Sequence, residues 1–216
     1  MSRLDVYTAV HKMQRARLFE LTVEAGKTDP ADPVAAARLA AAVDALADEL
    51  VAHGEHEERF IHPVLRVQAS GLADALEVAH VELDTRLDEL RHASATQAAA
   101  GDDPNLLYRA LAGFTAAYLE HLAVEESQAL PALWQGCGDD ELMGVLVSFK
   151  GSRSDTENLT SVLAQLPTLN PPEITRMAAV GLAGSAPEVA ELLATVLDPG
   201  QLGALRASLP GKGVKA

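Results

Sequence analysis

Cysteine, aromatic and basic residues are all scarce in this chain. The 216 residues include a single cysteine, Cys137, so no internal disulfide can form, as is typical of proteins in a reducing cytosol. The net charge of −14 argues against binding to nucleic acid or to an anionic membrane surface, because both carry negative charge themselves. Aromatic residues make up 4% of the chain and hydrophobic residues 48%, mostly Ala and Leu, which favours helices around a sizeable core.

Long uncharged hydrophobic runs are missing as well. A membrane-spanning helix needs about 18 or more consecutive apolar residues, and the sequence contains no such stretch. Residues 1–21, MSRLDVYTAVHKMQRARLFEL, are interrupted by Arg and Lys and lack the apolar centre of a signal peptide. We therefore expect a cytoplasmic protein without a membrane span.

Apolar residues recur at helical spacing and predict four long helices before residue 135. Two of these helices should begin at Asp-Pro pairs, because aspartate caps a helix N-terminus and proline fits its first turn. Pro63 and Pro131 should end or kink the second and fourth helices. The four helices are expected to begin near residues 3, 32, 70 and 103.

The two halves of this region repeat each other. HKMQRARLFEL, from residue 11, aligns with HVELDTRLDEL, from residue 80, at His, Arg, Leu, Glu and Leu. HGEHEERFIHP, from residue 53, aligns with HLAVEESQALP, from residue 121, at His, Glu, Glu and Pro. The repeat predicts an all-α fold: an antiparallel up-down four-helix bundle built from two helical hairpins.

Residues 136–216 read as a separate segment of short helices. It contains no histidine, and breaks are expected at Gly151, Pro167, Pro171-Pro172, Pro187 and Pro199-Gly200. We expect residues 1–135 to form the bundle and residues 136–216 an extension that packs on the bundle or on a partner. A homo-oligomer is compatible with this arrangement.

Each predicted helix places a histidine on its apolar face, and two helices add a glutamate one turn later. An ionised carboxylate in a bundle core costs several kcal/mol unless it is paired or bound to a metal. The apolar faces offer no Lys or Arg as a partner. These side chains are therefore predicted metal ligands: His11, His53, Glu57, His80, His121 and Glu125.

The composition of this set indicates the metal. Six nitrogen and oxygen ligands exceed the four of a tetrahedral zinc ion, and a mixture of imidazole and carboxylate suits iron or manganese. Two similar hairpins suggest two metal ions, with Glu57 and Glu125 placed to bridge them. We expect two non-haem iron ions, with manganese or zinc as less favoured alternatives.

These six residues resemble the pattern of the hemerythrin-like (HHE cation-binding) family. That pattern has a histidine on the first helix and another on the third. The second helix carries His-x-x-x-Glu, and the fourth carries His-x-x-x-Glu or His-x-x-x-Asp. The match covers about residues 1–135. The resemblance implies a non-haem di-iron centre that binds oxygen or related small molecules. Oxygen-carrying members have a second histidine one turn after that of the third helix, where this chain has Asp84, which argues against reversible oxygen carriage.

Other polar residues near the motifs are weaker candidates for the site. His56 is a candidate accessory ligand, and His62 is expected to be solvated near a helix end. His92 lies late in the third helix, where a cation suits the helix C-terminus. Glu58 and Glu126 are expected to be solvated or to contact the ligands.

Two further side chains lie one turn from a predicted ligand. Tyr118 is expected in the core, with a hydroxyl that could reach a metal-bound ligand. Asp84 either approaches the metal or is a solvated residue that leans towards Arg15.

The sequence leaves two functions open. The first is a di-iron protein that binds or reacts with oxygen, peroxide or nitric oxide, and the sequence does not decide whether this is enzymatic. The second is a non-enzymatic, iron-responsive module in which metal occupancy controls docking of a partner. A purely structural metal site is disfavoured, because a bundle of this size does not need a metal to fold.

Overall fold

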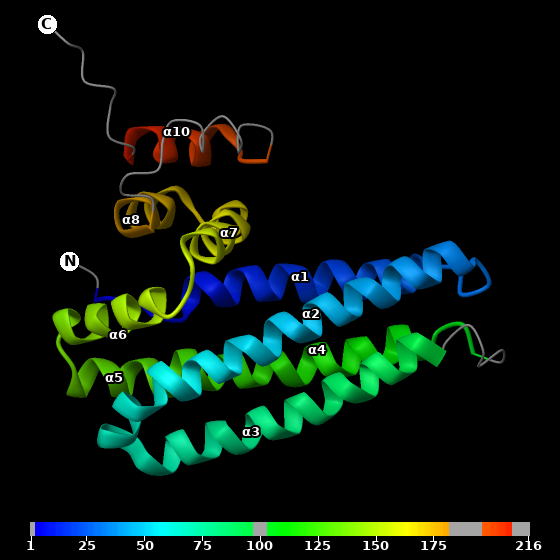
Figure 1. Ribbon diagram of the computed structural model, residues 1–216, viewed down its shortest axis with the longest axis horizontal. Helices are drawn as coiled ribbons and strands as arrows, with labels where there is room; N and C mark the ends of the chain where they lie inside the picture. The colour runs from blue at the N-terminus through cyan, green and yellow to red at the C-terminus, as the bar shows by residue number, and fades with distance from the viewer. Residues whose placement is uncertain (1–2, 97–102, 182–195, 209–216) are drawn as a thin grey trace, which may run out of the picture. The chain divides into compact units, whose positions relative to one another are not determined.

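A computed structural model describes residues 3–96, 103–181 and 196–208, and within these ranges all regular secondary structure is helical. Four long helices lie side by side, and successive helices run in opposite directions (Figure 1). The predicted fold of four long helices followed by short ones is confirmed. The long helices are α1 (Thr8–Lys27), α2 (Pro33–Phe60), α3 (His62–Thr96) and α4 (Leu106–Val124).

Contacts divide the chain into two compact units. The first contains residues 1–7 and 14–146, and the second contains residues 8–13 and 147–216. The predicted domain boundary at residue 135 stays a prediction. None of the helices in the described ranges has the length and apolar character needed to cross a membrane.

The N-terminal signals of the helices were predicted with mixed success. Asp32 caps α2 as expected, because its carboxylate accepts hydrogen bonds from the N–H groups of Val34 and Ala35, with Pro33 in the first turn. The prediction for α4 was wrong by two residues, because the capping position belongs to Asn105 and not to Asp103. Asp103 instead accepts a hydrogen bond from the backbone N–H of Asn105 in the preceding turn.

The first helix begins five residues later than expected, at Thr8 rather than near Arg3. The carboxylate of Asp5 accepts the N–H of Tyr7 at 2.9 Å, a local turn that competes with helix formation. Arg3 is held outside the helix, since its guanidinium donates to the carbonyl oxygen of Trp134 at 2.7 Å and pairs with Asp139.

The two proline positions act in different ways. Near Pro63, α2 ends at Phe60 and α3 begins at His62. Within α3, the backbone of Ala69 is not helical (φ −151°), and it separates a short first segment of α3 from the rest of that helix. Before Pro131 the chain stays helical but widens into a π-helical turn, η1 (Glu125–Ala129), and continues as α5 (Leu130–Gly136). The ring of Pro131 would clash with the carbonyl group four residues earlier, which a wider turn relieves.

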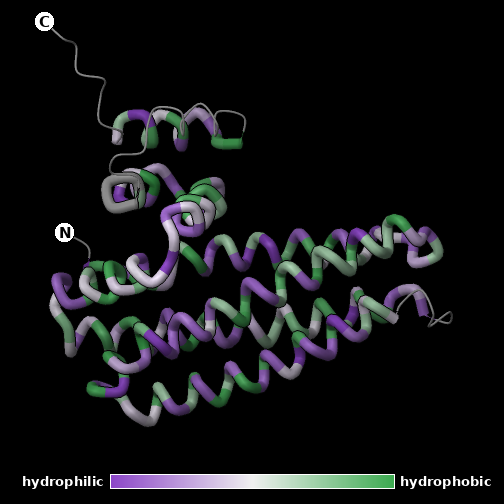
Figure 2. Tube along the Cα trace, viewed as in Figure 1, coloured by the Kyte–Doolittle hydropathy of each residue, from purple (hydrophilic) through white to green (hydrophobic). Residues whose placement is uncertain are grey.

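Hydrophobic and hydrophilic positions alternate along each long helix (Figure 2). The buried apolar residues of the first unit form two clusters, one around Leu87 and Leu111 and one around Leu65 and Leu133. Along α3, His80 stands between Leu76 of one cluster and Leu83 of the other. His80 therefore lies where one apolar cluster ends and the other begins along α3.

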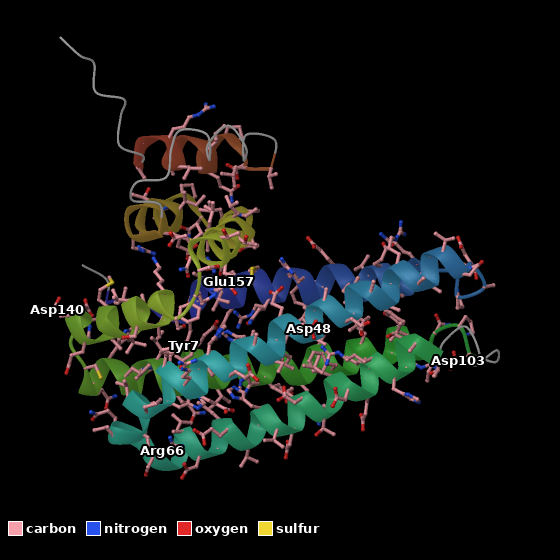
Figure 3. The ribbon with its side chains drawn as sticks, in the orientation of Figure 1. Tyr7, Asp48, Arg66, Asp103, Asp140 and Glu157 are labelled. Carbon is pink, nitrogen blue, oxygen red and sulfur yellow. The ribbon has the colours of Figure 1, made fainter. Side chains whose placement is uncertain are left out.

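The second unit has its own core of buried apolar residues around Leu166 and Ile174. A capping box between Ser154 and Glu157 starts α7, and Glu157 is labelled in Figure 3. The expected interruptions at Gly and Pro agree with the helix ends, apart from Pro187, which lies outside the described residues. The remaining helices are α6 (Asp139–Gly151), α7 (Asp155–Gln165), the 3-10 turn η2 (Leu166–Thr168), α8 (Pro171–Gly181) and α10 (Pro199–Ser208).

Candidate metal centre

The six predicted ligands come together in two groups that share both glutamates. In each group, one nitrogen or oxygen atom of every member lies within 4.8 Å of the others. By its contacts, the turn of α1 that carries His11 belongs to the second unit, and the other five residues belong to the first. The groups are His11, His53, Glu57 and Glu125, and His80, His121, Glu57 and Glu125.

Glu57 directs one carboxylate oxygen towards each group. Its Oε1 lies 3.0 Å from Nε2 of His53, and its Oε2 lies 3.4 Å from Nε2 of His80. The side chain is 2% exposed, so water cannot replace these neighbours. A carboxylate placed in this way can bridge two metal ions.

The His80 and His121 imidazoles converge. Their Nε2 atoms are 3.1 Å apart, and Nε2 of His121 lies 3.1 Å from Oε1 of Glu125. Two ligands about 2.1 Å from one metal ion, at a right angle, would be about 3.0 Å apart. The donor set and its spacing therefore fit a first-row metal ion.

Local helix geometry positions the ligands. His53 and Glu57, and His121 and Glu125, are each four residues apart on one helix and face the same side. Glu125 is also the first residue of the π-helical turn, and such turns are common at functional sites because they redirect side chains.

Glu58 contacts a ligand from outside the group. Its Oε1 lies 2.9 Å from Nδ1 of His80, which leaves Nε2 of His80 facing the other ligands. Such an outer carboxylate fixes the tautomer and orientation of a metal-binding imidazole. The equivalent residue of the other hairpin, Glu126, instead binds Arg15 through both oxygens, at 2.7 and 2.9 Å.

The acidic surroundings determine the charge of His80 when no metal is bound. Burial opposes protonation, but the carboxylates of Glu125, Glu57 and Glu58 raise the pKa of His80 to about 10. A protonated His80 therefore supplies the positive charge that the apolar faces lack. Metal binding would have to displace that proton.

Two tyrosines stand close to the shared carboxylates. Burial raises the pKa of Tyr118 and of Tyr7, labelled in Figure 3, well above the ordinary value, and the charges of Glu57 and Glu125 raise both further. Both hydroxyl groups therefore stay protonated at neutral pH. Tyr118 was expected in the core and is 3% exposed, whereas sequence reasoning had assigned Tyr7 no role at the site.

A small cavity adjoins the site. Its volume of about 10 Å³ corresponds to roughly one water-sized sphere. Its lining includes His53, His80, Tyr118 and the otherwise exposed Asp84. Asp84 does not pair with Arg15, which binds Glu126, so the expected leaning towards Arg15 is wrong.

The remaining histidines differ from one another. His92 is exposed, and His56 is half-buried and belongs to neither ligand group. The expectation that His62 is solvated is wrong, because its side chain is 0% exposed. Its position beside a proline suggested a helix end on the surface, but the His62 side chain is buried although Pro63 is exposed.

Gly54 allows the His80 ring to approach the backbone of α2. A β-carbon at this position would lie 3.3 Å from Nδ1 and 3.4 Å from Cγ of His80. We expect Gly54→Ala to displace the ring and weaken metal binding by about tenfold, while helix propensity stabilises the metal-free protein by up to about 1 kcal/mol.

Metal titration and denaturant unfolding of the same variant measure both effects. Gly113→Ala is the matched control, because a β-carbon at Gly113 of α4 would meet nothing within 4 Å. Equal metal affinities for the two alanine variants would show that Gly54 has no role in placing His80.

Comparison with known proteins identifies the chain by its family. The model of the hemerythrin HHE cation binding domain matches residues 2–133, which include all six ligand candidates. Neither the curated proteins nor the solved structures gave a match. The buried groups of histidine and glutamate, together with this match over more than half of the sequence, show that the chain belongs to the hemerythrin HHE cation-binding domain family.

Proposed function

We propose that this protein holds two non-haem iron ions and binds or reacts with oxygen, peroxide or nitric oxide. The observation that carries the proposal is the pair of buried ligand groups that share Glu57 and Glu125. Two histidines and two carboxylates per ion leave coordination positions for an exogenous ligand. Iron in such a site supplies one-electron oxidation and reduction together with these open positions.

The residues around the site suit a small ligand. The cavity beside His53 and His80 has room for roughly one water-sized molecule, which selects diatomic molecules and peroxide over larger substrates. The hydroxyl of Tyr118, which is protonated at neutral pH, can donate a hydrogen bond there. The contact between Glu58 and Nδ1 of His80 keeps the His80 ring in its orientation.

Reconstitution tests this function. The metal-free protein, loaded with Fe²⁺ without oxygen, should bind about two ions per chain by elemental analysis. Oxygen, peroxide and nitric oxide, added separately, should each be examined for an iron-dependent band in the near-ultraviolet or visible range. His92→Ala, which removes an exposed histidine of α3, should behave like the wild type. A wild-type protein with no iron-dependent spectrum under any of these conditions would rule out the proposed function.

One observation favours the second candidate, an iron-responsive module. The helical turn that carries His11 also carries Lys12, whose Nζ lies 2.7 Å from Glu173 of α8. A metal that orders this turn would also affect its ion pair with α8. Limited proteolysis with and without iron measures the effect, and identical cleavage patterns would exclude the module.

A further inference from the structure

His62 is a fully buried imidazole at the first position of α3. Its equivalent in the second hairpin is Leu130, which is 3% exposed and packs in an apolar cluster. The other hairpin therefore buries an apolar side chain at the equivalent position of the repeat. A histidine buried there costs free energy unless its nitrogens find a partner.

The surroundings of His62 supply little of that compensation. Its Nδ1 lies 3.5 Å from Oε1 of Glu77, which is long for a hydrogen bond. Glu77 is already bound by Arg66 at 2.7 Å, and Arg66 is labelled in Figure 3. Among the described residues, neither ring nitrogen of His62 makes a hydrogen bond.

The ring of His62 adjoins one of the two ligand groups. It stacks on the ring of His80, with centroids 5.4 Å apart and planes 12° apart. The Nε2 atom of His80 faces Nε2 of His121 at 3.1 Å and Oε2 of Glu57 at 3.4 Å. An imidazole without a hydrogen bond on either ring nitrogen therefore lies directly beside a convergent set of nitrogen and oxygen atoms.

We propose that His62 is a further metal ligand of the group formed by His80, His121, Glu57 and Glu125. Neutral imidazole is the form that binds metals, and a third histidine suits a first-row ion such as iron. This inference rests on the proposed function, because it requires a metal ion in that group. It makes the two metal positions unequal, so an exogenous ligand finds more free positions at the His11 and His53 group.

Cobalt substitution counts the histidine ligands directly. In a protein loaded with Co²⁺, each bound imidazole keeps one exchangeable N–H, which gives a strongly shifted proton NMR signal. We expect five such signals in the wild type and four in His62→Leu. His92→Leu, which changes an exposed histidine on the same helix, should retain five.

Metal affinity and the stability of the metal-free protein should change in opposite directions. In His62→Leu, affinity for one of two Co²⁺ ions should fall about tenfold or more, while the metal-free protein should unfold at the same or a higher temperature. His62→Gln, which keeps a polar side chain, should show the same loss of affinity if the leucine variant does not fold.

Two outcomes separate this inference from the proposed function. Two bound Co²⁺ ions with four shifted N–H signals in the wild type, and unchanged affinity in the His62 variants, would overturn the role of His62 alone. A wild-type protein that binds neither Co²⁺ nor iron would overturn the proposed function.

Discussion

The double variant Glu57→Gln, Glu125→Gln should lose most of the bound metal. The two carboxylates belong to both ligand groups, and glutamine keeps their size without their charge. The loss of affinity should exceed the 10- to 100-fold that loss of an outer partner typically costs. Elemental analysis of the purified variant after iron loading measures the metal-to-chain ratio.

The single variants sharpen this test. Because the two oxygens of Glu57 face the two groups, Glu57→Gln alone should weaken both metal positions. Glu126→Gln is the matched control, since Glu126 directly follows Glu125 but binds Arg15. Full iron retention in the double variant, or loss of only one ion in Glu57→Gln, would contradict bridging by Glu57.

The metal-free protein should lose stability as the pH rises from 6.5 to 9. His80 has a pKa of about 10 in the folded protein and an ordinary value of 6.5, so the folded state binds the proton more tightly. The resulting stabilisation is fully present below about pH 6.5 and is lost as the pH rises towards 10. Between pH 6.5 and 9 the loss should be about 3 kcal/mol, because a tenfold difference in proton affinity is worth about 1.4 kcal/mol.

Denaturant unfolding of the metal-free protein at the two pH values measures this difference. His80→Gln should remove most of it, and so should the double glutamine variant, which lacks two of the carboxylates that raise the pKa of His80. His92→Gln, at an exposed position, should retain it. Equal pH dependence in the wild type and in His80→Gln would show that His80 carries no such proton.

Metal binding should show the opposite pH dependence over the same range. Metal and proton compete for His80, so affinity should rise with pH, with about one proton released per chain from this residue. The carboxylates of this site thus have a positively charged partner with and without metal. Without metal the partner is the protonated His80 imidazole, and with metal it is the metal ion. The sequence pattern shows no cationic partner for these carboxylates, because the apolar faces contain no Lys or Arg.

Helical periodicity was enough to predict which histidine and glutamate side chains come together in the structure. His53 and Glu57 share a face because four residues make about one turn, whatever the rest of the chain does. The repeat between the two hairpins then predicted equivalent roles for His121 and Glu125. The cap at Asp32 was equally predictable, since a capping side chain binds N–H groups only two or three residues away.

The asymmetry between the hairpins was decided by tertiary structure alone. Glu58 and Glu126 hold equivalent positions in the repeat, yet one contacts His80 and the other binds Arg15. Periodicity determines the face on which a side chain lies, but not the rotation and register of the neighbouring helix. Those depend on packing between residues far apart in the sequence.

The surroundings of the ligands were decided in the same way. His62 reads as a surface residue beside a proline, but the turn between α2 and α3 buries it against His80. The direction of each oxygen of Glu57 depends on the positions of ligands from two other segments of the chain. Apart from that of His62, the sequence by itself determined which of these side chains enter the core, because that follows from one helix at a time. Only the tertiary structure decided which atoms meet there, because each such meeting involves several helices at once.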